Sequence, residues 1–197
     1  MNETYGLQIS AVILAAGSSR RFGTPKQLLE LGGKPILQHV IDAVSSRGFA
    51  EVVVVLGHAA ADIETALDLP EGARIVVNPD HTAGQSTSLR CGLASIAPDS
   101  DAAALFVGDQ PRLGVAAIDE VVRAFRSSGG PVARAVYRGT PGHPVIVARA
   151  TFDAFGAAGG DVGARAFLDA AEDVLQVDLD TDAPRDIDTP EDFEALP

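Results

Sequence analysis

Short runs of apolar residues alternate with longer amphipathic segments along this chain, and this alternation constrains the fold more than any other feature. The first run, Ile9–Leu14, is predominantly apolar and is followed by the small residues that lead to Gly17. Such runs are typical of strands that are buried on both faces of a parallel sheet. The longer segments between them have the spacing of helices, so the pattern indicates repeated βαβ units. We therefore predict an α/β domain in three layers, α/β/α, with a mainly parallel twisted sheet.

The expected elements follow in chain order, and two of them interrupt the regular pattern. The segments 132–137 and 144–148 flank a glycine-containing turn and are expected to form an antiparallel excursion from the sheet. In parallel α/β folds, ligands bind beyond the carboxyl ends of the strands. The loops after Leu14 and Val107 both lie at that edge. In full, we expect strands at 9–14, 52–56, 74–77, 102–107, 132–137, 144–148 and 175–179, and helices at 35–46, 59–67, 86–96, 115–127, 151–155, 162–170 and 190–196.

Charge and cysteine content exclude several classes of function. The formal net charge of −12 argues against nucleic acid as a partner, because binding to a phosphate backbone needs a basic face. No apolar run reaches the roughly 18 residues of a membrane span, and residues 1–8 do not have the pattern of a secretory signal. Cys91 is the only cysteine, which excludes an internal disulfide and a thiolate zinc cluster. We expect a single domain over residues 1–197, located in the cytoplasm and not bound to membranes.

The loop after the first strand combines small residues with three cations, Arg20, Arg21 and Lys26. Small residues allow backbone N–H groups to approach an anion closely, while Arg and Lys supply charge to phosphate oxygens. The loop lacks the spacing of a Walker A motif and of the Gly-x-Gly-x-x-Gly fingerprint. It therefore indicates a different kind of triphosphate site, and the alternative is a solvated basic turn.

Two acidic segments are candidates for a metal site. The segment Gly108-Asp109-Gln110-Pro111 follows the strand 102–107 directly, and the carboxylate of Asp109 could hold Mg²⁺ there, although Gly-Asp-x-Pro is also common in ordinary turns. Asp186 and Asp188 alternate along an extended segment and so share one face of it, which makes either a candidate for a second metal ligand. The helix start at Thr189 and Pro190 explains the acids that follow as favourable first-turn residues.

Three further segments carry polar residues at breaks between elements. The segment Gly84-Gln85-Ser86-Thr87-Ser88 precedes a helix, so Ser86 is either its N-cap or, with Ser88, part of a nucleoside site. His143 lies in Gly142-His143-Pro144, and Asp161 and Arg165 lie in a glycine-rich stretch. Taken alone, a lone His is more often a structural hydrogen-bonding group, and Arg165 is more often a surface residue.

Taken in order from Ile9 to Leu196, these segments resemble the MobA-like NTP transferase family, with greatest similarity to the molybdenum cofactor cytidylyltransferases. The resemblance implies a Rossmann-like, GT-A-type nucleotidyltransferase domain, with nucleotide binding over about 9–112 and acceptor binding over about 113–197. Phe22 departs from the usual Met of the family, with little expected consequence. The resemblance implies the following roles: catalysis by Arg21, Lys26 and Asp109; nucleotide binding by Leu14, Ala15, Ala16, Gly17, Ser18, Ser19, Gly84, Gln85, Ser86 and Ser88; acceptor binding by Gln110, His143, Asp161 and Arg165; metal binding by Asp109 and Asp188.

The activity that the resemblance implies is transfer of CMP from CTP to a phosphorylated acceptor, with Mg²⁺ as cofactor. Ala16 resembles the cytidylyl-transferring relatives, since the guanylyl-transferring ones have a second glycine at that position. The implied acceptor is molybdopterin or its molybdenum-loaded form, with contacts to molybdoenzyme maturation factors. Two alternatives stay open: a nucleotidyltransferase for a sugar phosphate or other phosphate acceptor, and a non-catalytic cofactor carrier.

Overall fold

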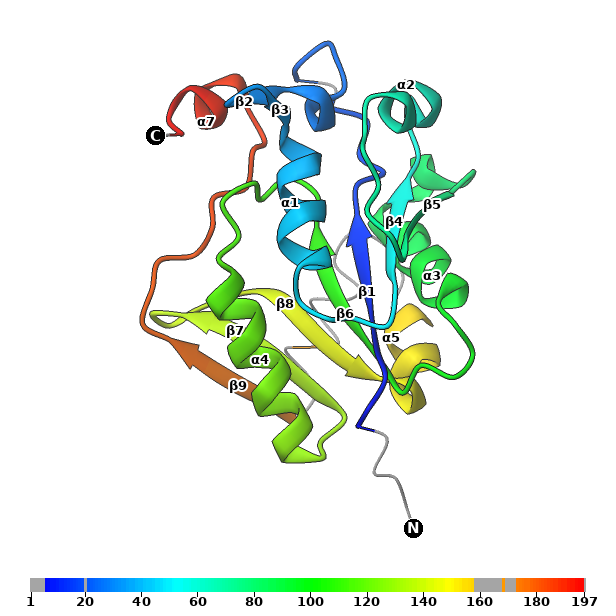
Figure 1. The fold of residues 1–197 in the computed structure, drawn as a ribbon, viewed down its shortest axis with the longest axis vertical. Coiled ribbons are helices and arrows are strands. Elements are labelled where there is room, and N and C mark those ends of the chain that lie inside the picture. Colours follow the sequence, from blue (N-terminus) through cyan, green and yellow to red (C-terminus); the bar gives the residue numbers. More distant parts are fainter. Residues whose placement is uncertain (1–5, 20, 158–167, 169–172, 197) are drawn as a thin grey trace.

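Seven strands form one twisted sheet in the order β5-β4-β1-β6-β8-β7-β9 (Figure 1). The computed structural model describes residues 6–19, 21–157, 168 and 173–196. Of the seven strands of this sheet, β8 alone runs antiparallel to its neighbours, β6 and β7, which confirms the mainly parallel sheet and the antiparallel excursion. The strands are β1 Ile9–Leu14, β4 Val52–Leu56, β5 Ala73–Val77, β6 Ala102–Val107, β7 Val132–Tyr137, β8 Thr140–Ala148 and β9 Val174–Leu179.

Helices cover both faces of the sheet, so the predicted three-layer α/β/α architecture is confirmed (Figure 1). On one face, the apolar sides of α1 and α4 bury residues such as Ile41 and Val121 against the sheet. On the other face, α3 and α5 bury Leu89 and Phe155 against Val12. Within the described residues, the α-helices are α1 Ile36–Ser45, α2 Ala60–Thr65, α3 Gln85–Ser95, α4 Val115–Ser128, α5 Phe152–Ala157 and α7 Pro190–Glu194. Among the described residues, no helix is long and apolar enough to cross a membrane.

Several short elements were not predicted from the sequence. A two-stranded antiparallel hairpin, β2 Glu30–Leu31 and β3 Lys34–Pro35, lies between β1 and α1. Strands of two residues are too short to show a hydrophobic period, so the sequence carries no signal for them. Pro35 was expected to be the first residue of this helix. In the structure it is the N-cap of α1 instead. The helix predicted at 162–170 lies outside the described residues except for Leu168.

A close contact between α3 and the sheet gives a first testable prediction. A Cβ atom at Gly92 would lie 2.5 Å from Cγ1 of Val12 and 3.1 Å from Cγ2 of Val55, both on buried central strands. In an exposed helix, Gly→Ala stabilises by about 1 kcal/mol. Here overpacking outweighs that gain, so we expect Gly92→Ala to lower the free energy of unfolding by about 1–2 kcal/mol. Urea denaturation measures this change.

A matched control is available at Gly114, the N-cap of α4. A Cβ there would meet no atom within 4 Å, and its φ of −75° is open to any residue. Gly114→Ala loses only the N-cap preference of Gly over Ala, so it is expected to lower the free energy of unfolding by less than Gly92→Ala does. Equal stability of the two variants would show that α3 does not press on the sheet as closely as described.

Candidate active site

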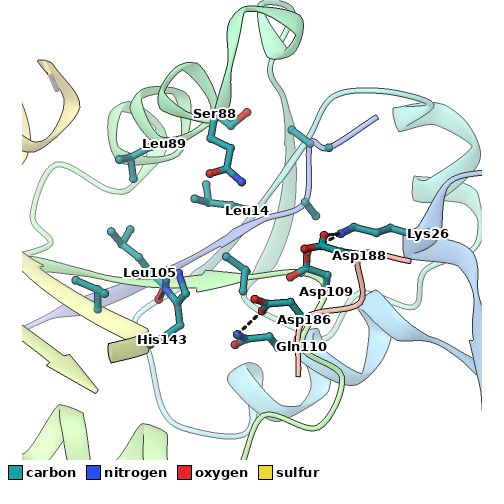
Figure 2. A pocket seen from close by; sticks show the side chains of 18 of the residues that line it. Leu14, Lys26, Ser88, Leu89, Leu105, Asp109, Gln110, His143, Asp186 and Asp188 are labelled. Carbon is teal, nitrogen blue, oxygen red and sulfur yellow. Dashed lines mark hydrogen bonds and ion pairs between the residues drawn. The ribbon is translucent and has the colours of Figure 1, made fainter. Parts of the chain in front are cut away.

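A cavity of about 930 Å³ lies at the carboxyl ends of β1 and β6, the edge at which the sequence predicted the site (Figure 2). Every predicted site residue that the structure describes lines this cavity. Asp161 and Arg165 lie outside the described residues. The residues brought together are Leu14, Ala15, Ala16, Gly17, Ser18, Ser19, Arg21, Lys26, Gly84, Gln85, Ser86, Ser88, Asp109, Gln110, His143 and Asp188.

The loop after β1 is held in place by a buried side chain that the sequence analysis missed. The Nε2 atom of Gln27, a residue only 3% exposed, donates to the carbonyl oxygens of Ala15 at 2.7 Å and Gly17 at 3.1 Å. The Ser19 hydroxyl donates to Gln27 Oε1 and accepts from the backbone N–H of Lys26. These bonds are internal to the protein, so they hold Ala15, Gly17 and Ser19 in place without a ligand. The only sequence signal for Gln27 was its place directly after Lys26.

Gly108 permits the end of β6 to approach this loop. A Cβ at Gly108 would lie 2.7 Å from the Cβ of Ala15 and 3.0 Å from Leu37 Cδ1. A side chain there would therefore separate β6 from the loop after β1. Without one, Asp109 is placed directly beside the glycine-containing loop.

Lys26 joins two segments that are far apart in the chain. Its Nζ donates to Asp109 Oδ2 at 2.7 Å, to the Ile187 carbonyl at 2.8 Å and to Asp188 Oδ1 at 3.0 Å (Figure 2). Burial by itself lowers the pKa of Lys26, but attraction to Asp109 and then Asp188 outweighs it, so the net shift is upward. Lys26 is therefore a cation held at the floor of the cavity.

Asp186, Gln110 and His143 form a second polar group in the same cavity. Gln110 Nε2 donates to Asp186 Oδ1 at 2.7 Å (Figure 2). Burial, together with repulsion from Asp109 and Asp188, raises the pKa of Asp186 against the opposing effect of the Gln110 hydrogen bond. Burial lowers the pKa of His143, whose Nδ1 lies 3.3 Å from the Leu105 carbonyl. The cavity therefore contains a buried group of side chains that could exchange hydrogen bonds with a polar ligand.

The start of α3 is fixed by Asn78, a residue for which the sequence analysis predicted no role. Asn78 is 2% exposed, and its Nδ2 donates to the hydroxyls of Thr87 and Ser88, while its Oδ1 accepts from the backbone N–H of Asp80. Since the N-cap of α3 is Gly84, the interpretation of Ser86 as the N-cap is wrong. The Ser86 residue lies inside the helix and lines the cavity. By contrast, the Thr189 cap of α7 is present as a capping box with Asp192.

The acidic residues here suit a divalent metal ion. Among the described residues, Asp109 Oδ1 is one of three buried side-chain oxygens without a hydrogen-bond partner. Within the same residues, no group of three or more His, Cys, Asp or Glu could hold a metal by itself. A site built from Asp109 and Asp188 would match Mg²⁺, which is usually held by one or two carboxylates plus substrate phosphates and waters.

Solved structures with the same fold include a metal complex. Rv0371c from Mycobacterium tuberculosis H37Rv superimposes with a TM-score of 0.86 and 30% sequence identity, over 96% of this chain and 97% of that chain. The same protein has also been solved in complex with manganese, and that structure superimposes with a TM-score of 0.84.

Curated relatives differ in name and in length. Nicotine blue oxidoreductase of Paenarthrobacter nicotinovorans is 31% identical over 169 residues, 81% of each chain. The bifunctional protein GlmU of Sorangium cellulosum is 35% identical over 133 residues, 64% of this chain and 28% of that protein. The chain thus spans about a quarter of the length of the GlmU proteins that it matches.

The model of one protein family covers most of the chain. Residues 11–174 match the MobA-like NTP transferase domain. The matched region contains the loop after β1, Lys26 and Asp109, and it ends before Asp188. The chain therefore belongs to the MobA-like NTP transferase family.

Proposed function

We propose that this protein transfers CMP from CTP to a phosphorylated small-molecule acceptor, with release of pyrophosphate. The observation that carries the proposal is the meeting of Lys26, Asp109 and Asp188 beside the loop after β1. It places one cation and two carboxylates at a cavity that is also lined by Arg21 and by small residues. Such a group suits a triphosphate with a divalent ion better than it suits a sugar or an uncharged ligand. The choice of CTP rests on Ala16.

In the proposed reaction, a phosphate oxygen of the acceptor attacks the α-phosphorus of CTP. A new P–O–P linkage forms, and the bond from the α-phosphorus to the bridging oxygen of the β-phosphate breaks. The electron pair of that bond leaves with pyrophosphate. The acceptor phosphate is already mostly ionised near neutral pH, so no general base is required.

The residues of the cavity have distinct roles in this reaction. Lys26 and Arg21 neutralise charge that develops on the transferred and leaving groups. Asp109 and Asp188 would hold Mg²⁺, which supplies charge stabilisation and a template for the phosphates. The residues 14–19 bind the phosphates, while Ser86 and Ser88, with Gly84 and Gln85, orient the nucleoside. Because Lys26 pairs with both carboxylates, it keeps them close together until the nucleotide binds.

The acceptor is assigned to the side of the cavity opposite Ser88 (Figure 2). Gln110 and His143 lie there together, and Asp161 and Arg165 are proposed to contribute from the segment outside the described residues. We propose molybdopterin or its molybdenum form as the acceptor, in the cytoplasm, with maturation factors of molybdoenzymes as contacts. The support is the resemblance of the segments around Gly84, Gly142 and Gly160 to those of molybdenum cofactor cytidylyltransferases.

The proposal is tested by pyrophosphate release with Mg²⁺, each of the four NTPs, and either molybdopterin or its molybdenum form. We expect release with CTP only, and none after chelation of the metal. Turnover with a sugar phosphate instead of the pterin would overturn the acceptor assignment. Binding of CTP without turnover on any acceptor would favour the carrier alternative.

A redox reaction is a further candidate function, beside the alternatives named above. One observation favours it: a relative of similar length is named an oxidoreductase. The ion pairs of Lys26 with Asp109 and Asp188 suit the binding of phosphates and a metal ion. They do not by themselves support hydride or electron transfer. The four-NTP assay decides between the two, because an oxidoreductase would release no pyrophosphate.

A further inference from the structure

A second cavity, of about 330 Å³, lies next to the first. The two cavities share residues of the loop after β1 and of the turn before α3, so they are neighbouring compartments of one depression. Six of the eight described residues that line the second cavity have polar side chains. They are the imidazoles of His58 and His81 and the hydroxyls of Ser18, Ser19, Thr24 and Thr82.

The chemistry of this lining suits an anion. Hydroxyls and imidazoles can all donate hydrogen bonds. No residue that the structure describes as lining this cavity carries a carboxylate, although the protein has a net charge of −12. The larger cavity, by contrast, is lined by Asp109, Asp186 and Asp188. The carboxylates that could hold a metal therefore line the larger compartment, whereas the second compartment offers hydrogen-bond donors without a carboxylate.

His81 lies at the boundary between the two compartments. It can pack there because Gly57, directly beside it, has no side chain. A Cβ at Gly57 would lie 2.5 Å from the Cβ of His81 and 2.9 Å from the carbonyl oxygen of Ala16. The His81 ring therefore packs over the backbone that follows β4, beside the loop after β1. The ring of His58 lies 6.3 Å away, measured between ring centroids. Both imidazoles can reach one small ligand.

We propose that this second cavity binds the terminal phosphates of the nucleotide, and hence the pyrophosphate product, with His58 and His81 as hydrogen-bond donors. The inference rests on the proposed nucleotidyl transfer and extends it to two residues for which the sequence analysis assigned no role. Ser18 and Ser19 border both cavities, so a triphosphate that crosses this loop would have its α-phosphate near Lys26 and its far end near His81. Hydrogen bonds to a charged phosphate are stronger than neutral ones.

The test compares the binding of CTP, CMP and inorganic pyrophosphate, each with Mg²⁺, by isothermal titration calorimetry. We expect His58→Ala and His81→Ala each to weaken the binding of CTP and pyrophosphate by about tenfold, which is the size of one lost hydrogen bond to a charged group. CMP lacks the terminal phosphates, so its affinity should not change. Gly57→Ala displaces His81 and also crowds the Ala16 carbonyl, so it should weaken the binding of CTP and pyrophosphate at least as much as His81→Ala does. His39→Ala is the matched control, because His39 contacts the Leu31 carbonyl and lines neither cavity.

Each outcome separates this inference from the proposed function. If the wild-type protein binds no NTP, the proposed function fails. If it binds CTP, but the histidine variants keep the same ratio of CTP to CMP affinity, the subsite alone is wrong. Should His81→Ala or Gly57→Ala not fold, His58→Ala still decides, because His58 is exposed and its removal leaves no cavity in the core.

Discussion

Replacing Lys26 by Met is expected to lower kcat/KM for CMP transfer by roughly 10²–10³-fold, the cost of removing one group that stabilises transition-state charge. The variant keeps the apolar stem of the side chain and removes the ammonium that contacts Asp109 and Asp188. The two carboxylates then face the triphosphate without a fixed cation between them. Steady-state pyrophosphate release measures the effect, and thermal unfolding shows whether the variant is folded.

Lys34 provides the matched control, because it is the only other lysine in the chain. Its Nζ pairs with Asp42 Oδ2 at 2.6 Å on the surface, and the Lys34 side chain is 47% exposed. Exposed ion pairs contribute little to stability, so Lys34→Met should leave both rate and stability nearly unchanged. If Lys26→Met kept more than about a tenth of wild-type activity, Lys26 would not have the charge-stabilising role proposed here.

Replacing Asp109 by Asn is expected to have an effect at least as large, again roughly 10²–10³-fold or more in kcat/KM. The substitution keeps the shape of the side chain but removes the negative charge that a divalent ion requires. It also removes the ion pair with Lys26, so both the metal and the cation lose a partner. Activity is again measured by pyrophosphate release with Mg²⁺ and CTP.

Binding of Mn²⁺ without nucleotide separates the two variants, and electron paramagnetic resonance detects it. Asp109→Asn should lose most of this binding because a ligand is gone. Lys26→Met should retain it, because an ammonium group is not a metal ligand. Asp119→Asn is the control, since Asp119 pairs with Arg47 at 3.0 Å on the surface. Wild-type Mn²⁺ affinity in Asp109→Asn would rule out Asp109 as a metal ligand.

Parts of the site that depend on one segment could be predicted from the sequence. The loop after Leu14 and the position of Asp109 follow from local patterns, because a buried strand that ends in small or acidic residues presents them at the sheet edge. Helix capping was less predictable. Thr189 was expected at the start of α7 and forms a capping box there, whereas Ser86 proved to be inside α3 rather than at its start. Gly84 took the capping position because its φ of 112° is readily adopted only by glycine.

The sequence alone determined the order of the seven sheet strands and of the main helices in the described part of the chain, the three-layer architecture and the chemical character of the loop after β1. These follow from hydrophobic periodicity and from residue type, which act over a few neighbours in the chain. Only the tertiary structure decided which distant groups meet. Lys26 and Asp188 are 162 positions apart, and their contact depends on how the segment after β9 returns along the sheet edge. The hydrogen bonds of Gln27 to the loop and the packing of His81 over Gly57 were likewise decided by the tertiary structure. Packing in three dimensions leaves no periodic signal in a single sequence.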